Sequence, residues 1–291
     1  ANIIMRIGFL ILAHKYPHQL IKLINSLLKY ENSTIILHID LKAEALYQEI
    51  CDKYSKHNKV LVLKNRYKVY WGSFNQIRAT LELIKEGVTH NLQYYCLLSG
   101  QDIPIQPINK FAHFLEQNIG AEYLVNFKLP SVQWEEGGIN RLALYYFDVE
   151  TNSVLLKKIS SLVLRIQRFT GFKRKIKHEL YGGANWFTLS NGALGYVCEY
   201  LEKNPSYLSS FKFSRCADEI FLQTILLNSS FKPKIVSESL RVVDWSSGPE
   251  FPKIFKTNDF EKLMRMPGKF FARKFDETVD DEIIDKLHSH V

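Results

Sequence analysis

The chain has 291 residues, with 38 Lys and Arg against 30 Asp and Glu, which gives a formal net charge of +8 and a pI near 9.1. Hydrophobic residues make up 46% of the chain and charged residues 23%, which excludes a disordered protein and a coiled coil. No apolar run reaches the ~18 residues of a transmembrane helix. The positive charge favours a polyanionic partner: nucleic acid, an anionic membrane surface or a phosphate-bearing ligand.

Segments typical of strands and helices alternate through the first half of the chain. The apolar run from Gly8 to Ala13 is typical of a strand buried on both faces. We interpret residues 1–13 as the first strand rather than as a signal peptide. Further strands are predicted at 34–38, 59–63, 94–98 and 123–125, and helices at 18–28, 73–85 and 108–116. This alternation predicts an α/β fold, with a mostly parallel central sheet and helices on both faces.

The second half is less regular. A strand is predicted at 186–189 and helices at 154–169, 192–202, 216–227 and 277–288, with Gly182 and Gly183 in a turn. Pro249 and Pro252 interrupt the chain before the last helix. The sequence contains no internal repeat and no low-complexity linker, so we expect a single domain over residues 1–291.

Polar residues follow three of the predicted strands. They are His14 and Lys15, the pair His38-x-Asp40, and Ser99-x-x-Asp102. Each alone is more often a loop cap, but together they predict one ligand crevice, because open α/β sheets bind ligands beyond the carboxyl ends of their strands. His38 and Asp40 could be two metal ligands, although two without a third do not define a metal site. The four cysteines form no CxxC pair, which predicts no structural zinc site and a reducing, cytoplasmic environment.

Three other motifs each allow two interpretations. Trp71 could stack on a base or sugar, or pack in the core as the sequence alone favours. Asp218 and Glu219 open an apolar helix, where a carboxylate either compensates the helix dipole or acts as a general base. Arg241 and Lys274 stand beside aromatic residues, where they either lie on a solvated face or clamp a diphosphate.

Residues 154–177 form a basic amphipathic stretch. Such a helix can attach a protein to an anionic membrane surface. The other interpretation, which the sequence alone favours, is a core helix with a solvated basic face.

Seven segments, in this order, resemble a known family. They are Leu10-Ile-Leu-Ala-His-Lys15, Ile36-Leu-His-Ile-Asp40, Trp71-Gly-Ser-Phe74, Leu97-Leu-Ser-Gly-Gln-Asp-Ile-Pro104, Ala184-Asn-Trp-Phe187, Asp218-Glu219 and Phe271-Ala-Arg-Lys-Phe-Asp276. Together they resemble glycosyltransferase family 14, the core-2/I-branching N-acetylglucosaminyltransferases and peptide O-xylosyltransferases. The resemblance runs from about Ile7 to Asp276, and it predicts a bacterial member reduced to the catalytic domain, without the anchor and stem of animal members.

The resemblance implies a GT-A fold and an inverting transfer from a UDP-sugar, UDP-GlcNAc or UDP-xylose, to a hydroxyl of a glycan. It implies no metal or other cofactor, in agreement with the lack of an Asp-x-Asp motif. The expected acceptor is a bacterial surface polysaccharide or its lipid-linked precursor. The expected location is the cytoplasm, with attachment to the inner face of the membrane. The alternative is a catalytically silent sugar-nucleotide or glycan-binding protein on the same fold. No nucleic-acid-binding motif is present, so we expect no nucleic-acid partner.

The resemblance also assigns site residues. It makes Glu219 the general base and Lys274, with Arg241, the cations that stabilise the leaving UDP. The donor-binding residues it implies are Leu12, Ala13, His14, Asp40, Trp71 and Asp102, and the acceptor-binding residues are Asn185, Trp186, Glu135 and Arg141. The second cation is Arg241 by the spacing Leu-Arg-x-x-x-Trp, and Lys253 by the pattern of the branching enzymes. A nucleotide-binding half is expected at about 5–130, an acceptor and catalytic half at about 131–276, and a C-terminal helix at 277–291.

Overall fold

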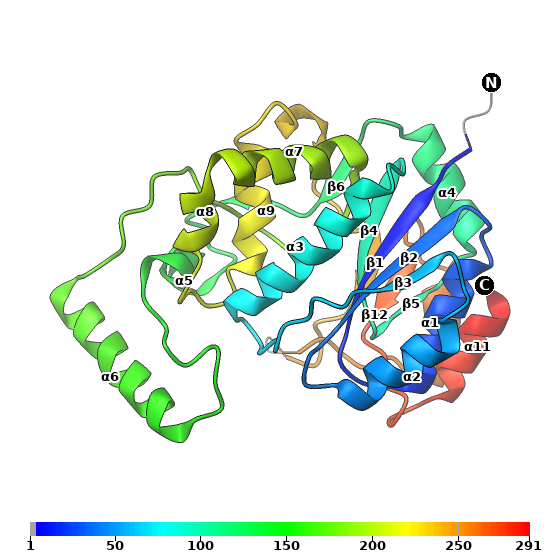
Figure 1. Ribbon diagram of the computed structural model, residues 1–291, viewed down its shortest axis with the longest axis horizontal. Helices are drawn as coiled ribbons and strands as arrows, with labels where there is room; N and C mark the ends of the chain where they lie inside the picture. Colours follow the sequence, from blue (N-terminus) through cyan, green and yellow to red (C-terminus); the bar gives the residue numbers. More distant parts are fainter. Residues whose placement is uncertain (1–3, 249–250) are drawn as a thin grey trace.

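A seven-stranded sheet forms the centre of the molecule (Figure 1). The computed structural model describes residues 4–248 and 251–291, so the first three residues and Pro249 lie outside the described residues. The strands lie in the order β10-β6-β9-β4-β1-β2-β3. Their bounds are β1 Ile7–Ala13, β2 Ser33–Ile39, β3 Val60–Val62, β4 Tyr94–Ser99, β6 Glu122–Leu124, β9 Phe187–Ser190 and β10 Ile235–Val236. Only β9 runs antiparallel to its two neighbours in this sheet, which confirms the predicted mostly parallel sheet.

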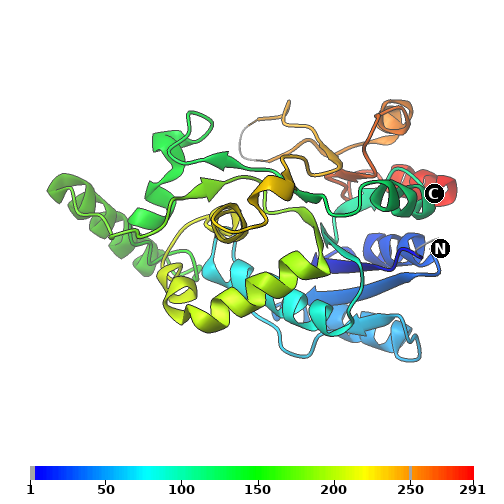
Figure 2. The same cartoon turned by 90° about the horizontal axis from the view of Figure 1, so that it is seen from above.

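Helices cover both faces of the sheet because its buried strands are apolar on both sides (Figure 2). Phe9 and Ile11 of β1 point into one core cluster and Leu10 into the other, as the two-residue period of a strand requires. The first cluster is closed by α1 Pro17–Leu28, α2 Glu44–Tyr54, α4 Ile108–Gln117 and α11 Glu282–His290. The second is closed by α3 Phe74–Thr89, α7 Asn191–Lys203, α8 Pro205–Ser210 and α9 Asp218–Leu227. The predicted α/β class is therefore confirmed.

A second, three-stranded sheet lies against the first cluster. It has the order β11-β12-β5, with β11 Arg241–Val243, β12 Phe271–Arg273 and β5 Asp102–Pro104. In the antiparallel pairing of β12 and β5, Arg273 stands directly opposite Asp102. Short elements complete the fold: β7 Phe127–Lys128, η1 Glu135–Gly138, α5 Asn140–Ala143, β8 Tyr181–Gly182, η2 Lys232–Lys234, η3 Thr257–Asp259 and α10 Phe260–Met264.

Helix α6, Val154–Thr170, projects from the body at the end opposite α2 and α11 (Figure 1). The helix itself is where the sequence predicts it. Its expected role as a core helix is wrong, because its buried side chains are Ser160 and Gln167 while most of its apolar side chains are exposed. Within the described residues, no helix combines the length and the apolar character needed to cross a bilayer.

The start of the last helix differs from its prediction, and one helix was not predicted. The last helix begins at Glu282 instead of residue 277. The preceding residues form a loop in which Asp276 accepts hydrogen bonds from Thr278 and Asp280 accepts them from Thr257. Helix α2 was missed, because only Leu46, Ile50 and Tyr54 of its eleven residues are buried and its apolar pattern is correspondingly weak.

Candidate active site

The residues of the predicted crevice lie at the carboxyl edge of the central sheet. Strand β1 pairs in parallel with β2 on one side and β4 on the other. The residues after these strands, His14, Asp40 and Ser99-Gly100, are therefore neighbours across one edge. Backbone bonds tie the three ends together: Asp40 N donates to Ala13 O at 2.8 Å and Gly100 N to Leu12 O at 2.9 Å.

Asp40 organises the loop beside this edge. Its carboxylate accepts hydrogen bonds from the backbone N–H of Lys42 at 2.8 Å and of Val69 at 3.3 Å, and Lys42 Nζ lies 3.5 Å away. Only 6% of the Asp40 side chain is exposed, and Ala13 is buried as well. His38 is also occupied: its buried Nε2 accepts from Tyr67 N at 3.1 Å, and burial lowers its pKa to about 4. Asp40 and His38 therefore fix the loops at this edge of the sheet, while the side chain of His14 is exposed there.

Positive charge gathers at this edge. The pKa of His14 is lowered by desolvation first, and then by the charges of Lys15, Lys274 and Lys42, which outweigh the opposing effect of Asp40. The pKa of Lys274 is lowered by burial and by the charges of Arg273 and Lys15. Within residues 4–248 and 251–291, neither Lys15 nor Lys274 has a carboxylate within ion-pair distance. Like charges that repel one another without such a counterion make a site for an anionic ligand.

Arg241 and Asp102 are not at the surface of this crevice. They form a buried ion pair at 2.9 Å, with 1% and 0% of their side chains exposed, and Arg241 also donates to Leu97 O at 2.9 Å. Arg273 Nη1 lies 3.5 Å from the second Asp102 oxygen. Arg241 was predicted as a diphosphate cation and Asp102 as a donor contact. In the structure they instead join the small sheet to β4. The other candidate cation, Lys253, pairs with Asp259 at 2.6 Å, and its carbonyl accepts from Lys274 N at 3.4 Å.

The two candidate catalytic carboxylates begin helix α9. The loop before them packs on the loop before α3, where Cys216 N donates to Gly72 O at 2.9 Å. Gly72 has φ +71°, and a Cβ there would lie 2.8 Å from Cys216 Sγ, so this close approach requires glycine. Trp71 is 75% exposed beside this junction. Its interpretation as a core tryptophan is therefore wrong, and its ring is free to meet a ligand.

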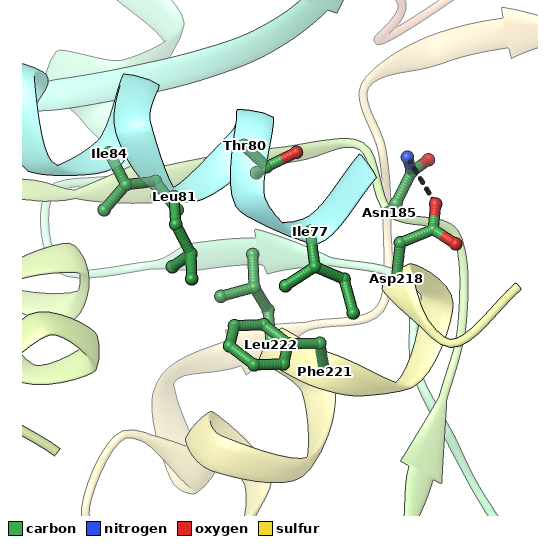
Figure 3. Close-up of a pocket in the computed structure, with 8 residues that line it drawn as sticks. All are labelled: Ile77, Thr80, Leu81, Ile84, Asn185, Asp218, Phe221 and Leu222. Atoms are coloured by element: carbon green, nitrogen blue, oxygen red, sulfur yellow. Dashed lines mark hydrogen bonds between the residues drawn. The ribbon is translucent and has the colours of Figure 1, made fainter. Parts of the chain in front are cut away.

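Asp218 and Glu219 have different partners. Glu219 pairs with Arg141, whose guanidinium lies 3.7 Å above the ring of Trp134. Asp218 accepts a hydrogen bond from Asn185 Nδ2 at 3.2 Å (Figure 3). The structure thus joins two residues predicted on the acceptor side, Asn185 and Arg141, directly to the predicted catalytic carboxylates.

The surroundings of the carboxylates raise their pKa values. Burial, and secondarily the charge of Glu219, raises the pKa of Asp218 to about 7. Burial also raises the pKa of Glu219, against the lowering effect of Arg141. About a third of the Glu219 side chain is exposed, at 35%, so an acceptor hydroxyl can reach it. A carboxylate with a raised pKa that a ligand can approach is suited to act as a general base near neutral pH.

Trp186 links the carboxylates to the positive edge. The guanidinium of Arg273 lies 4.2 Å above its ring and that of Arg241 lies 5.2 Å away. Trp186 follows Asn185, and Arg273 precedes Lys274. The order across the site is therefore cations, then Trp186 and Asn185, then the two carboxylates, then Arg141. Glu135 is exposed and stands outside this order, and its neighbour Glu136 instead pairs with Arg168 at 2.9 Å.

A small apolar pocket lies behind the carboxylates, between α3 and α9 (Figure 3). Ile77, Leu81 and Ile84 line it from α3, and Phe221 and Leu222 from α9. Asn185 and Asp218 stand at its polar end. This pocket places the Asp218 carboxyl against apolar side chains, which is the desolvation that raises its pKa.

No group of three or more His, Cys, Asp or Glu side chains arranged to hold a metal ion occurs in the part of the chain that the structure describes. Sequence reasoning missed two residues of the site, Arg273 and Trp134. Arg273 stands inside a segment that carries the family resemblance, beside Lys274. Trp134 immediately precedes Glu135, and only its stacking on Arg141 shows its part in the site.

Comparison with curated proteins gives several relatives that are named xylosyltransferases. Xylosyltransferase 2 of Rattus norvegicus is 23% identical over 310 residues, which cover 99% of this chain and 34% of that protein. Xylosyltransferase 2 of Homo sapiens is 22% identical over 309 residues, covering 99% of this chain and 34% of that protein. Xylosyltransferase oxt of Drosophila melanogaster is 22% identical over 306 residues, covering 97% and 33%. The chain thus spans about a third of the length of these relatives.

The fold and the site define an α/β protein with paired carboxylates near a cationic sheet edge. A family profile described as "Core-2/I-Branching enzyme" matches residues 7–265, which is most of the chain. The chain belongs to the Core-2/I-branching enzyme family.

Proposed function

We propose that this chain is a glycosyltransferase that moves a sugar, with inversion, from UDP-GlcNAc or UDP-xylose to a hydroxyl of a glycan acceptor. The observation that carries the proposal is the run of contacts from the cationic edge, through Trp186 and Asn185, to Asp218 and Glu219. It supports the proposal because cations, which suit an anionic leaving group, lie at one end of the run, and carboxylates, which suit a base, lie at the other.

The proposed reaction is a single displacement. The acceptor oxygen attacks the anomeric carbon as the bond from that carbon to the diphosphate oxygen breaks, and the hydroxyl proton passes to Glu219. The negative charge that grows on UDP is stabilised by Lys274 and Lys15, as preorganised cations stabilise developing charge. We assign these two lysines the role that the family resemblance implies for Lys274 and Arg241, because Arg241 is buried in its ion pair with Asp102.

We further propose that the reaction needs no metal ion, because the cations at the sheet edge can neutralise the diphosphate. Trp71 is the proposed stacking surface at the donor, since its ring is exposed beside the carboxylates. We also propose a surface polysaccharide or its lipid-linked precursor as the acceptor, and a cytoplasmic location, which the lack of a CxxC pair supports.

A donor screen tests this proposal. Thermal shift and UDP release are measured with a panel of nucleotide sugars, each with and without EDTA. We expect one UDP-sugar to stabilise the protein and to release UDP when a glycan acceptor is added, with no effect of EDTA. Glu219→Gln should keep the donor-induced shift and lose roughly 10²–10⁴-fold in turnover, the usual contribution of a general base. Glu261→Gln, an exposed carboxylate of α10, is the matched control.

The opposite results are equally informative. Loss of UDP release on chelation would overturn the metal-free account, and full activity of Glu219→Gln would overturn the assignment of the base. Donor binding without turnover under all conditions would identify the silent binding protein instead. Lys274→Ala should weaken the donor-induced shift, whereas Lys56→Ala, an exposed lysine at the end of α2, should not.

A further inference from the structure

Helix α6 is attached to the body by polar contacts. Ser160 Oγ donates to the Asp148 carboxylate at 2.8 Å and accepts from Phe147 N at 3.1 Å. The Gln167 amide bonds both backbone groups of Tyr145, at 2.9 and 3.0 Å. Ser160 and Gln167 are seven residues apart, so they lie on the same side of the helix and fix that side toward the body.

The apolar side of α6 faces away from the body. Phe169 is 93% exposed and Leu155 is 67% exposed. The exposed apolar side chains of α6 are Val154, Leu155, Leu156, Ile159, Leu162, Ile166 and Phe169. They recur at the three- and four-residue spacing of one helix face. A continuous apolar face of this kind on a projecting helix marks an interaction surface.

The charge around this face identifies its partner. Residues 151–178 contain eight Lys and Arg and no Asp or Glu. Lys158 and Arg165 lie at the edge of the apolar face by helical spacing, and Lys173, Lys175 and Lys177 are exposed just beyond the helix. A second copy of the chain docked on this face would bring like charges together. An anionic lipid surface complements both the apolar face and its cations.

We propose that α6, with the basic segment that follows it, binds the surface of an anionic lipid bilayer. The helix lies in the plane of the interface, with its apolar side chains among the acyl chains and its Lys and Arg at the headgroups. It does not cross the bilayer, since its 17 residues include four cations. This binding does not depend on the proposed reaction.

The test is co-sedimentation of the whole protein with vesicles, without any donor. We expect binding to phosphatidylcholine vesicles that contain phosphatidylglycerol and little binding to phosphatidylcholine alone. Lys157→Glu/Lys158→Glu should weaken binding at least tenfold, since each basic residue near such a surface contributes roughly fivefold. Leu162→Ser/Ile166→Ser should also weaken binding at least tenfold, because it removes two side chains of the apolar face. All four side chains are exposed, so the thermal unfolding midpoint should not change.

Two control variants match these changes elsewhere. Lys53→Glu/Lys56→Glu makes the same change of net charge at α2, at the opposite end of the molecule, and Ile119→Ser/Val279→Ser removes two exposed apolar side chains. Both controls should bind like the unmodified protein. No binding at low salt, or an equal loss in the α2 variant, would overturn the proposal. A concentration-dependent dimer that Leu162→Ser/Ile166→Ser abolishes, without vesicle binding, would show that a second copy covers the face.

Discussion

Asp218 and Glu219 are adjacent in sequence, but their surroundings give them different roles. Asp218 lies against an apolar pocket and has an amide as its partner, so its charged form is disfavoured. Glu219 is opposite a guanidinium, which favours its charged form. When the surroundings give two neighbouring carboxyl groups different pKa values, the group with the higher pKa keeps its proton. The other group is ionised and can accept one. We therefore expect Glu219 to be the base and Asp218 to hold a proton at mildly acidic pH.

This difference makes a prediction about stability. The pKa of Asp218 is about 7 in the folded protein and ~4 in an unfolded chain, so the stabilisation that its protonated form provides is lost as pH rises between these values. Asp218→Asn carries no charge and keeps an acceptor for Asn185. Relative to the unmodified protein, we expect it to gain stability from pH ~4 to pH ~7 and then level off, by on the order of 1–3 kcal/mol.

Urea unfolding across this pH range measures the effect. Asp52→Asn, an exposed carboxyl of α2, is the control and should show no comparable trend. A constant difference between Asp218→Asn and the unmodified protein at all pH values would contradict the raised pKa of Asp218.

At the scale of elements, the small sheet fixes the position of Lys274. Lys274 directly follows β12, whose last residue stands opposite Asp102 of β5. Arg241 of β11 then joins this sheet to β4 through Asp102 and Leu97 O. The buried pair therefore sets where the cationic edge meets the end of β4.

This arrangement predicts a structural role for Arg241. Arg241→Met leaves the buried Asp102 carboxylate with the backbone N–H of Ser99 and the more distant Arg273 as partners, which should cost about 3–5 kcal/mol of stability. Asp102→Asn/Arg241→Met removes both charges and should recover most of that loss. Thermal unfolding measures the recovery, and the double variant should still be stabilised by the UDP-sugar donor. If Arg241 binds the diphosphate instead, the double variant will be stable but will not respond to donor.

The elements with a strong local pattern could be predicted from the sequence. Strands β1, β2 and β4 and helices α1, α3 and α7 have continuous apolar runs or clear helical spacing, and they are found within a few residues of their predicted bounds. Strands β5, β11 and β12 could not be predicted, because each has three residues and pairs with segments far along the chain. For α6 the spacing predicts an amphipathic helix but does not show which face is buried.

The same limit applies to the site. Asp218, Glu219 and Lys274 could be proposed from motifs because their residue types suit the chemistry. The burial of Arg241 and Asp102 depends on a contact between residues 139 positions apart, which residue type and spacing do not show. The exposure of Trp71 likewise depends on the close approach of Gly72 to Cys216.

At the scale of the whole molecule, the central sheet and the arm, which is α6 with the basic segment after it (residues 154–177), are separate parts of the structure. The carboxyl edge of the sheet brings together residues from both halves of the chain, as Lys15 and Lys274 show. The arm reaches away from α2 and α11 and carries much of the positive charge (Figure 2). The arm meets the site side of the molecule through the pair of Arg168 and Glu136, a few residues before Arg141.

The two ends of the arm lie side by side. The rings of Tyr145 and Phe172 stack with centroids 6.1 Å apart, and Phe147 packs on Phe213 at 5.2 Å. Because the chain leaves and re-enters the body at one place, the arm is a single insertion into the body. A deletion between Glu150 and Phe172, closed by a short glycine linker, removes no strand of the three sheets. We therefore expect that this segment can be lengthened, replaced or removed while the body around the central sheet still folds.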